Sequence, residues 1–375
     1  MKKVCISTCY NTSNYGSRLQ ATALSVAIQK MGYDVYAFKA IKAYRFILAH
    51  PRLVVARISR RIAQKTGKKF FVPVPYQMSP ERKIRMDEYT KKYFHELSIP
   101  TDDEWKKLIS EKVIFVAGSD IIWQPAFGYP ERYFLDFAVY ADLPCFSYAS
   151  SVGSLTLPKK YYGAYRKYLD SYKAIGVREN ATVDMFSKII NNPLTKVTDP
   201  TLLLTSQDWE EFASNARYSV EIEDRYIFCY FVMNDQRYWD YAKKVQDITG
   251  LQILVLPMHY LDEEQPFTII KDGTPYEFVD LIKNAEFVLT DSFHTCAFSL
   301  QFKKEFYLLR RERKAEDAKF DEFLNRYGLS DITIIDKCTF ERKTQIDYDL
   351  AYQRLESDRA ESVVFLKQAL LKCEE

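Results

Sequence analysis

Short apolar runs, each ending abruptly in small, polar or charged residues, recur along this chain and constrain its fold more than any other feature. Segments with apolar residues at helical spacing separate these runs, an alternation typical of a parallel sheet covered by helices. The first unit predicts a strand at residues 3–9, a polar loop at 10–18, a helix from Leu19 that stops at Gly32, and a strand at 34–38. The pattern therefore predicts an α/β fold.

The apolar runs form two series. The first continues with runs at 112–117, 144–149, 174–177 and, as a final strand or connector, 199–204. The second series has its runs at 225–232, 252–256, 286–289 and 305–309. Because 375 residues are long for a single core, we predict two domains, residues 1–205 and 220–375. The second would end in an amphipathic tail helix, residues 348–372, that packs back across both halves.

Residues 39–85 form a strongly basic insertion in the first of these domains. They contain thirteen lysines and arginines against one acid, Glu81, so their net charge of +12 leaves −9 for the other 328 residues of a chain whose total is +3. The apolar residues of the insertion are interleaved with its cations, which suits either a helix at a membrane surface or a helix packed on the protein with its arginines in solvent. Nucleic-acid binding is not expected, because the positive charge is confined to this segment.

Composition and short motifs exclude several classes of protein. The seven cysteines are scattered without a CxxC pair, which favours a reducing compartment and gives no zinc-site pattern. The amino terminus lacks the features of a signal peptide, and no run reaches the roughly 18 apolar residues that a membrane span needs. We therefore expect a cytoplasmic protein without a metal site, which the basic insertion could bring to the inner face of the membrane.

Nucleotide chemistry is disfavoured by the loop that follows the first strand. This loop has one glycine, Gly16, where a dinucleotide fingerprint needs the GxGxxG spacing, and the GxxxxGK motif of nucleoside triphosphate binders is absent from the chain. We accordingly expect no cofactor. Asn14, Tyr15, Gly16 and Ser17 precede the first helix, so their backbone N–H groups could hold an anion, although an ordinary strand-to-helix turn explains them equally well.

The most informative segment follows the apolar run Phe287 to Leu289, which breaks into Thr290, Asp291, Ser292 and His294. In an open α/β sheet the carboxyl end of a strand is where ligands bind. His294 is the one histidine of four that directly follows such a run. A side chain that titrates near neutrality suits proton transfer, and Asp291 or Ser292 could orient the ring or hold substrate. The alternative is a structural histidine.

Other candidate residues also stand at predicted strand ends. Asp120 could contact an acceptor hydroxyl or act as a base, and the alternative is a helix cap. Arg178 could meet a carboxylate or phosphate with its planar fork, and the alternative is a surface arginine paired with Glu179. A basic run that includes Arg310 and Arg311 could bind phosphate or lie in solvent.

Four motifs occur in order along the chain: Asn14-Tyr-Gly-Ser-Arg-Leu-Gln; Gly118-Ser-Asp-Ile-Ile-Trp-Gln with Tyr133-Phe-Leu-Asp-Phe; Val177-Arg-Glu with Asp199-Pro-Thr-Leu-Leu; and Thr290-Asp-Ser-Phe-His with Ala297-Phe. Together they resemble the polysaccharide pyruvyl transferase family over residues 3 to about 330, the insertion omitted. The chain departs from the family at four places: Thr295 stands where a glycine is usual, Ile121 and Gln124 replace Gln and Asn, and a late Ser-Arg-Ile survives only as the cation Lys319.

The resemblance implies two Rossmann-like domains in a GT-B-like arrangement, with the active site in the cleft between them. It implies transfer of pyruvyl from phosphoenolpyruvate to two hydroxyls of a sugar, as a cyclic ketal, in the biosynthesis of surface or capsular polysaccharide. The acceptor would be a sugar or a lipid-linked oligosaccharide. A rival interpretation is a nucleotide-sugar-dependent glycosyltransferase, because fold alone does not separate the two activities.

Roles follow for the candidate residues if the resemblance holds. We predict His294 as the acid–base residue, with Asp291 and Asp120 as further catalytic groups. The predicted donor-binding residues are Arg178, Ser292, Asn14, Gly16, Ser17, Lys319, Arg310 and Arg311. The predicted acceptor-binding residues are Gly118, Ser119 and Tyr15.

Overall fold

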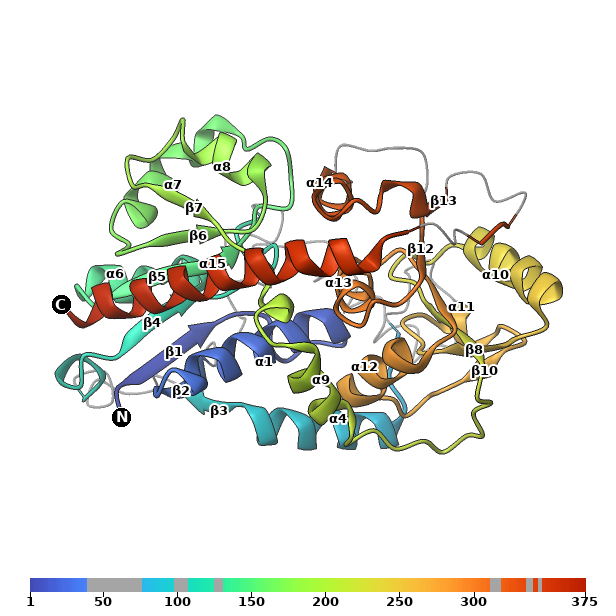
Figure 1. Cartoon of the computed structure of the whole chain (residues 1–375). Helices are drawn as coiled ribbons and strands as arrows, with labels where there is room; N and C mark the ends of the chain where they lie inside the picture. The colour runs from blue at the N-terminus through green and yellow to red at the C-terminus, as the bar shows by residue number, and fades with distance from the viewer. Residues whose placement is uncertain (39–75, 98–106, 125–130, 311–317, 335–339, 343–345) are drawn as a thin grey trace, which may run out of the picture.

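Two parallel β-sheets, each flanked by helices, form the architecture of the computed structural model (Figure 1). The structure describes residues 1–38, 76–97, 107–124, 131–310, 318–334, 340–342 and 346–375. The predicted α/β fold of two Rossmann-like halves is confirmed. None of the described helices is long and apolar enough to cross a membrane.

The first sheet has seven parallel strands, in the order β3-β2-β1-β4-β5-β6-β7. Its order reverses between β1 and β4, which opens a crevice outside their carboxyl ends. Both of these strands are buried on both faces, as a central parallel strand must be. The strands are β1 (Lys3–Ser7), β2 (Asp34–Phe38), β3 (His95–Leu97), β4 (Ile114–Ala117), β5 (Cys145–Ser150), β6 (Ile175–Val177) and β7 (Leu194–Lys196).

The second sheet repeats this topology with six parallel strands, in the order β10-β9-β8-β11-β12-β13. Its order reverses between β8 and β11, so a second crevice lies outside the carboxyl ends of those strands. The strands are β8 (Tyr226–Tyr230), β9 (Gln252–Val255), β10 (Thr268–Ile269), β11 (Phe287–Thr290), β12 (Phe306–Leu309) and β13 (Thr333–Ile334).

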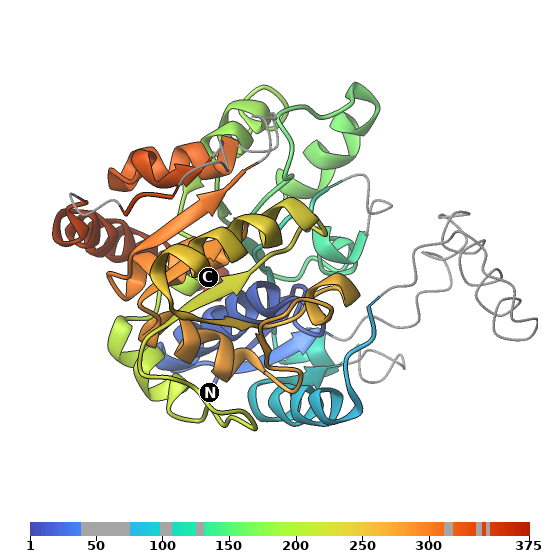
Figure 2. The same cartoon turned by 90° about the vertical axis from the view of Figure 1, so that its right-hand side faces the viewer.

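Helices connect the strands and cover both sheets (Figures 1 and 2). Those of the first half are α1 (Tyr15–Lys30), α4 (Pro80–Tyr93), α6 (Asp136–Tyr140), α7 (Tyr162–Leu169), α8 (Asn180–Phe186) and α9 (Ser206–Ala213). Those of the second half are α10 (Gln236–Thr249), α11 (Tyr260–Glu263), α12 (Pro275–Asn284), α13 (Phe293–Gln301) and α14 (Ala318–Tyr327). Short 3-10 turns are η2 (Glu131–Phe134), η3 (Lys159–Tyr161), η4 (Pro200–Leu202) and η6 (Ser330–Ile332).

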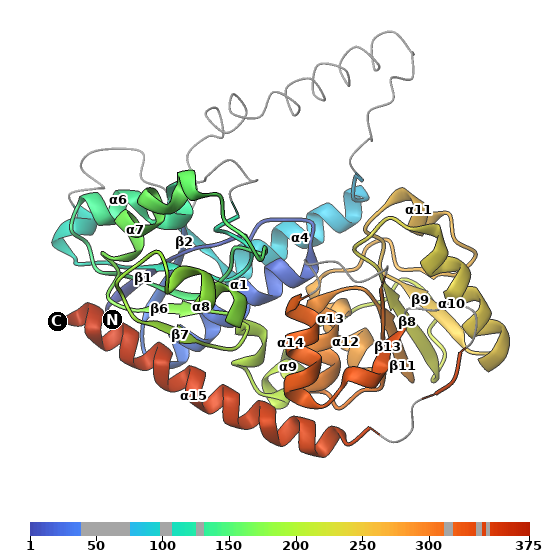
Figure 3. The same cartoon turned by 90° about the horizontal axis from the view of Figure 1, so that it is seen from above.

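The last helix, α15 (Tyr348–Glu374), runs along both halves of the molecule (Figures 1 and 3). It contacts α13 and α14 in the second half and β4 and β5 in the first. The predicted tail helix that packs back across both halves is therefore confirmed. One cluster of buried apolar side chains also continues through both halves, and its members include Leu19, Trp209, Phe278, Phe298 and Leu366.

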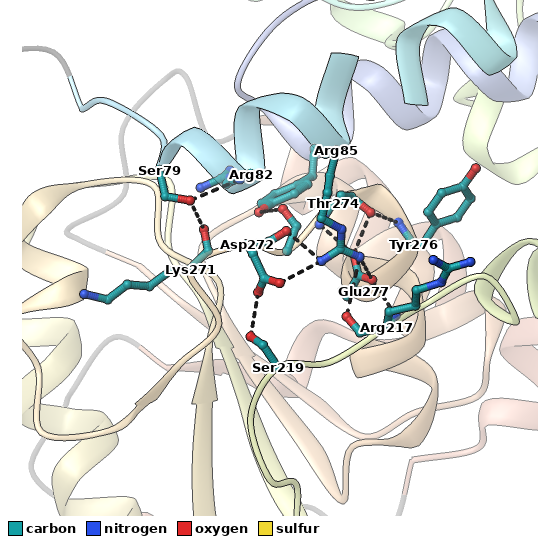
Figure 4. A network of polar contacts seen from close by, with 12 residues as sticks. Ser79, Arg82, Arg85, Arg217, Ser219, Lys271, Asp272, Thr274, Tyr276 and Glu277 are labelled. Atoms are coloured by element: carbon teal, nitrogen blue, oxygen red, sulfur yellow. Dashed lines mark hydrogen bonds and ion pairs between the residues drawn. The ribbon is translucent and has the colours of Figure 1, made fainter. Parts of the chain in front are cut away.

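Helix α4 joins the first half to loops of the second (Figure 4). Arg85 donates hydrogen bonds to Asp272 Oδ2 at 3.0 Å and to the fully buried Glu277 Oε1 at 2.5 Å. Arg82 is also fully buried and donates to the carbonyl of Pro257 at 2.7 Å. These two arginines belong to the segment predicted as a basic insertion, so two of its last three cations make a contact between the halves, and Lys83 between them is exposed. Residues 39–75 lie outside the described residues.

Several element boundaries differ from those predicted. Helix α1 begins at Tyr15 and not at Leu19, because Asn14 caps it by accepting a hydrogen bond from the Ser17 N–H at 3.1 Å. Its predicted end is confirmed, since Gly32 follows it with a φ of 92°, which favours glycine. The run at 199–204 is not a strand, because Pro200 opens the 3-10 turn η4 there.

Candidate active site

His294 lies where the carboxyl edges of the two sheets meet. It occupies the first turn of α13, and Ser292 caps that helix by accepting a hydrogen bond from the Thr295 N–H at 3.4 Å. The ring of His294 packs against α1 of the first half. A Cβ atom on Gly16 would stand 2.1 Å from His294 Nδ1, so any residue larger than glycine would displace the ring. Gly16, predicted as a donor contact, thus allows the close approach of the histidine ring to α1.

Asp199 is the carboxylate that faces His294. Its Oδ2 lies 3.6 Å from His294 Nε2, which is a buried nitrogen. The other oxygen, Oδ1, accepts hydrogen bonds from the backbone N–H of Thr201 at 3.0 Å and from its hydroxyl at 2.8 Å, which fixes the carboxylate plane. A distance of 3.6 Å is longer than a hydrogen bond, but acid–base contacts of this kind often tighten only when substrate is present.

Arg178, at the end of β6, is the second group that contacts Asp199 Oδ2. Its Nη1 donates to the same Asp199 Oδ2 at 2.9 Å, and its Nε donates to Glu179 Oε1 at 2.8 Å. The guanidinium also lies over the ring of Phe293, 5.1 Å from the ring centroid. Burial lowers the pKa of Arg178, but the carboxylates of Glu179, Asp199 and Asp120 outweigh it, so the pKa rises above its usual value. Arg178 is buried, and it is not the surface arginine of the alternative reading.

Asp120 follows β4 and lies close enough to His294 and Arg178 to interact with their charges. Its Oδ2 accepts a hydrogen bond from the Ser17 hydroxyl at 2.8 Å, and its Oδ1 accepts one from the Ile121 N–H at 2.9 Å. Its backbone has a φ of 83°, a conformation that costs free energy in a non-glycine residue and is frequent at functional sites. Burial raises the pKa of Asp120, whereas the charges of Arg178 and His294 lower it, and the net pKa is below the ordinary value.

The charges of this cluster decide what it can bind. Three carboxylates, those of Asp120, Glu179 and Asp199, stand against the single guanidinium of Arg178. Burial raises the pKa of Asp199, but His294 and Arg178 lower it well below its usual range, so the carboxylate stays ionised. An excess of carboxylates accepts hydrogen bonds from hydroxyl groups and repels a bare anion. An anionic substrate would therefore need further cations at the edge of the cluster.

A cavity of about 440 Å³ adjoins the cluster, and Arg178, Asp199 and Phe293 form part of its wall. Lys319, predicted as a donor contact, lines the same cavity from α14. Arg310 does not: it is buried, and its Nη1 donates to Asp321 Oδ1 at 2.6 Å within the second half. Arg310 was predicted to contact the donor substrate, but in the structure it forms an ion pair with Asp321 instead. Arg311 lies outside the described residues.

Asp291 does not orient the histidine ring. Its Oδ1 accepts a hydrogen bond from the Val232 N–H at 2.6 Å, and its Oδ2 accepts one from the Met233 N–H at 2.9 Å. Both donors follow β8, so Asp291 ties the ends of β8 and β11 together. Burial raises its pKa to about 7. The predicted catalytic role of Asp291 is thus corrected, because Asp199 and not Asp291 is the carboxylate that faces His294.

Tyr15 was predicted to contact the acceptor, but it is fully buried between the two halves. Its hydroxyl donates to the carbonyl of Gly273 at 3.0 Å, and its ring stacks on Phe278 with centroids 5.4 Å apart. The prediction is wrong because the helix begins at Tyr15 itself, which turns this side chain towards the second half. Asn14 caps α1, because its side-chain oxygen accepts a hydrogen bond from the Ser17 N–H. This N–H is therefore already paired within the protein and is not a donor for an anion.

Gly118 and Ser119, the other predicted acceptor contacts, lie beneath the site. The N–H of Gly118 donates to the carbonyl of Ser7 at 2.9 Å, and a Cβ on Gly118 would stand 2.7 Å from Thr8. The side chain of Ser119 is buried. Both residues therefore pack β4 against β1 and place Asp120, and they offer no surface to an acceptor in this conformation.

Asp199 is the site residue that the sequence did not assign. It follows β7, a strand of three residues whose exposed side chains give no apolar run. Two signals were available: its place in the motif Asp199-Pro-Thr-Leu-Leu, and its capping pattern, an aspartate directly before Pro200 at the start of a turn. Cys296, on α13 beside the site, is fully buried, and burial raises the pKa of its thiol. Within the described residues, no group of three or more His, Cys, Asp or Glu side chains could hold a metal ion.

Solved structures with the same architecture include enzymes that act on nucleotide sugars. A UDP-GlcNAc 2-epimerase from Neisseria meningitidis, bound to UDP-GlcNAc, is 10% identical with a TM-score of 0.52, over 99% of this chain and 100% of that one. A UDP-GlcNAc 2-epimerase from Methanocaldococcus jannaschii is 13% identical with a TM-score of 0.49, over 94% and 91%. A glycosyltransferase from Streptomyces sp. SF2575 is 11% identical with a TM-score of 0.42, over 100% and 96%. The likeness to the Neisseria enzyme supports a GT-B-like fold, as predicted.

Sequence comparison is more specific than the fold. No curated protein matches the chain in sequence. The family model of polysaccharide pyruvyl transferase matches residues 14–313, a span that begins at the cap of α1 and contains Asp120, Arg178, Asp199 and His294. This span is most of the chain, and the protein therefore belongs to the polysaccharide pyruvyl transferase family.

Proposed function

We propose that this protein transfers the pyruvyl group of phosphoenolpyruvate to two hydroxyls of a saccharide, forming a cyclic ketal during biosynthesis of a surface or capsular polysaccharide. The observation that carries the proposal is the contact of His294 with Asp199 Oδ2, which Arg178 shares. This contact unites an acid–base residue of the second half with charged residues of the first. Family membership supports a transferase that acts on polysaccharides.

The reaction needs one proton and two hydroxyl attacks. A proton must reach the methylene carbon of phosphoenolpyruvate, which makes the neighbouring carbon electrophilic. The first sugar hydroxyl then adds to that carbon, the second displaces phosphate, and the two hydroxyl protons balance the new methyl group and the released phosphate. His294 is the proton donor in this proposal, because imidazole exchanges protons near neutral pH. Asp120, ionised and 2.8 Å from the Ser17 hydroxyl, is positioned to accept a hydroxyl proton.

Arg178 and Lys319 are the proposed contacts for the donor's carboxylate and phosphate. A guanidinium carries five N–H groups. The ion pairs of Arg178 with Glu179 and Asp199 engage its Nε and Nη1, so the fork still has N–H groups for an anion. Lys319 adds a second positive charge from α14, on the wall of the same cavity. These cations offset the acidic character of the inner cluster.

The principal test is a reaction with defined substrates. The protein is incubated with phosphoenolpyruvate and a panel of 4-nitrophenyl glycosides, and both phosphate release and the mass of a pyruvyl ketal are measured. We expect phosphate release that requires a glycoside and disappears in His294→Gln. Absence of both signals with every glycoside would contradict the proposal.

A second candidate function is a nucleotide-sugar-dependent glycosyltransferase on the same fold. The Neisseria epimerase, whose structure contains UDP-GlcNAc, shows that this fold accommodates such ligands. Thermal unfolding with phosphoenolpyruvate, UDP and GDP separates the two candidates, since a ligand that binds only the folded protein raises its melting temperature. We expect stabilisation by phosphoenolpyruvate alone. Stabilisation by UDP or GDP, without phosphate release in the first test, would favour the glycosyltransferase.

The proposal extends to the place of the reaction. Acceptors of such pathways are often carried on a membrane lipid, as the family resemblance implies. Residues 39–75 hold ten of the thirteen cations of the basic insertion and lie outside the described residues. In this proposal they hold the enzyme at the inner face of the membrane, beside a lipid-linked acceptor.

A further inference from the structure

The cavity beside the active site has walls from both halves of the molecule. Arg178 and Asp199 form its inner end, and the opposite wall comes from α14 and α15. Figure 1 shows α14 facing the edge of the first sheet where β6 and β7 end, with α15 passing alongside both. Two contacts close this junction: the Asn180 N–H donates to Glu322 Oε2 at 3.0 Å, and Lys196 pairs with Glu322.

The charges on the cavity wall nearly cancel. Four cations and five carboxylates line it. Several are already paired with one another, as Arg326 Nε is with Asp358 Oδ2 at 2.9 Å. The Tyr327 hydroxyl donates to the same Asp358 oxygen at 3.0 Å. A wall of paired charges offers many hydrogen-bond donors and acceptors without a net field, which suits a neutral ligand rich in hydroxyl groups.

The volume of the cavity and its aromatic lining also favour a saccharide. A volume of about 440 Å³ lies within the range of roughly 300–1,000 Å³ typical of ligand pockets. Phosphoenolpyruvate is much smaller than the ligands that fill such pockets. Aromatic side chains, Phe293, Phe323 and Tyr327, also line the cavity and offer apolar surface to the C–H face of a sugar ring.

We infer that this cavity binds the acceptor, a short neutral saccharide whose reacting hydroxyls point towards Asp199. The role of this saccharide as acceptor rests on the proposed function. The binding of a saccharide in the cavity does not depend on that function. Asp199 lines the cavity, and its Oδ2 lies 3.6 Å from His294 Nε2, so a hydroxyl bound at the inner end is one carboxylate away from the acid–base residue. Acceptor binding thus moves from the predicted Gly118, Ser119 and Tyr15 to the space between β7, α14 and α15.

Variants that fill the cavity test the inference. Glu361 on α15 and Asn180 on α8 are exposed and line the cavity from different elements. Glu361→Trp and Asn180→Trp each place a large side chain in it. Gln368→Trp is the matched control, because Gln368 is exposed on the same helix as Glu361 and is not among the lining residues. Two independent filling variants keep the test decisive if one of them folds poorly.

Binding is measured without chemistry, by saturation-transfer NMR with 4-nitrophenyl β-galactoside, β-glucoside, α-mannoside and N-acetyl-β-glucosaminide. We expect at least one glycoside to bind the wild-type protein and the Gln368→Trp control, and to lose most of its signal with both filling variants. In turnover, each filling variant should raise the KM for the glycoside about tenfold or more, and by a larger factor than the KM for phosphoenolpyruvate, whose proposed contacts Arg178 and Lys319 lie on the same wall.

The outcomes separate this inference from the proposed function. Glycoside binding that depends on the cavity, without phosphate release from phosphoenolpyruvate, would support the saccharide site and sink pyruvyl transfer. Phosphate release with unchanged glycoside KM in both filling variants would support pyruvyl transfer and overturn the acceptor site. If none of the glycosides binds the wild-type protein, the assignment of a neutral saccharide to this cavity is wrong.

Discussion

Asp199 offers one carboxylate oxygen to two groups, and the energetics of the site depend on that sharing. Its Oδ2 takes the Arg178 Nη1 hydrogen bond at 2.9 Å and faces His294 Nε2 at 3.6 Å. Buried charges are tolerated only when they are paired and hydrogen-bonded. The carboxylate therefore holds the guanidinium in the site and leaves the imidazole facing an ionised partner, an arrangement that the proposed binding and proton transfer both require.

Replacement of His294 by glutamine tests the acid–base role. Glutamine keeps a hydrogen-bonding side chain of similar reach but cannot transfer a proton near neutral pH. We expect turnover to fall by about two to four orders of magnitude, the usual contribution of a positioned acid or base. Phosphate release from phosphoenolpyruvate with a 4-nitrophenyl glycoside is the measurement. His95→Gln, on the exposed strand β3, is the control and should be as active as the wild type. Near-normal turnover of His294→Gln would remove this residue from the mechanism.

Asp199→Asn should lower both activity and stability. Removing one partner of a buried ion pair typically costs about 3–5 kcal/mol, and here Arg178 loses the carboxylate on Nη1. The pKa of Asp199 in the folded protein lies below its ordinary value, so its stabilising effect is present above the unfolded pKa of about 3.9 and is lost as pH falls through the folded pKa.

Urea unfolding of wild type and Asp199→Asn, followed from neutral pH down to about pH 3, measures this effect. We expect the wild type to be more stable at neutral pH and its advantage to shrink only below the ordinary carboxyl range. Asp170→Asn provides a control carboxylate, since Asp170 pairs with backbone and side-chain N–H groups near the surface. An advantage that does not change with pH would show that the charge of Asp199 is irrelevant to folding.

The strand-end rule predicted His294, Arg178 and Asp120 of the candidate cluster, and it did not assign Asp199 for a physical reason. His294, Arg178 and Asp120 each lie within four residues after the end of an apolar strand, so their place at a ligand edge could be inferred from sequence alone. Asp199 follows the short and exposed strand β7, and its contact with His294 exists only because the two halves pack together. The predicted role of Tyr15 was wrong for a related reason. The residue at which α1 begins decides which way the Tyr15 side chain points, and the sequence pattern did not fix that residue.

At the scale of elements, the same logic explains which parts of the fold could be predicted. Strands such as β4, β8 and β11 are buried along their whole length and stood out as apolar runs. The edge strands β3, β7, β10 and β13 have only two or three residues and are largely exposed or half-buried, so their sequences carry no pattern. Such strands form because a neighbouring strand offers hydrogen bonds, which local sequence does not encode.

The Asp291 carboxylate, which ties β8 to β11, makes a prediction about pH. Burial raises its folded-state pKa to about 7, whereas the unfolded value is near 3.9. Between these values the folded protein holds a proton that the unfolded chain has lost, so this group's contribution to the free energy of unfolding falls as pH rises from about 4 to about 7. Asp291→Asn cannot titrate and should lose that dependence.

The measurement compares the urea midpoints of wild type and Asp291→Asn across this pH range. We expect the free-energy difference to shift in favour of the variant as pH rises, by up to a few kcal/mol. Comparison with Asp240→Asn, an exposed position on α10, controls for general loss of charge. A difference that stays constant from about pH 4 to pH 8 would contradict the role given to Asp291.

Helix α4 should contribute to stability through Arg85. Arg85→Ala removes ion pairs with Asp272 and Glu277 (Figure 4). Glu277 is fully buried but still accepts hydrogen bonds from the Thr274 N–H at 2.7 Å and the Arg217 N–H at 2.7 Å. We therefore expect a loss of about 1–3 kcal/mol, the cost of a weakened buried polar group, rather than that of an isolated charge. Urea unfolding should show it, and Lys83→Ala, exposed on the same helix, should stay within about 0.5 kcal/mol of wild type.

At the scale of the whole molecule, two features act together. One apolar core continues through both halves, which fixes the carboxyl edges of the two sheets against each other and so keeps His294 beside Asp199. The charge is distributed very unevenly, with +12 in residues 39–85 and −9 in the remainder. The arginines of this segment that the structure describes, Arg82 and Arg85, serve the contact between the halves, and only Lys83 of its described cations is exposed, so an attraction to a membrane would come mainly from residues 39–75.

The membrane prediction is therefore placed on Arg57, Arg60 and Arg61. Anionic lipid attracts nearby cations by about 1 kcal/mol each at the membrane surface, and salt screens the attraction. In liposome flotation we expect binding to vesicles that contain phosphatidylserine but not to neutral vesicles, with loss of binding at high salt and after all three arginines are changed to glutamine. The control changes three exposed lysines elsewhere, Lys188, Lys244 and Lys367, by the same total charge and should bind as the wild type does. If the wild type fails to float with anionic vesicles at low salt, or if both triple variants lose binding equally, the segment is no membrane contact and its charge serves another purpose.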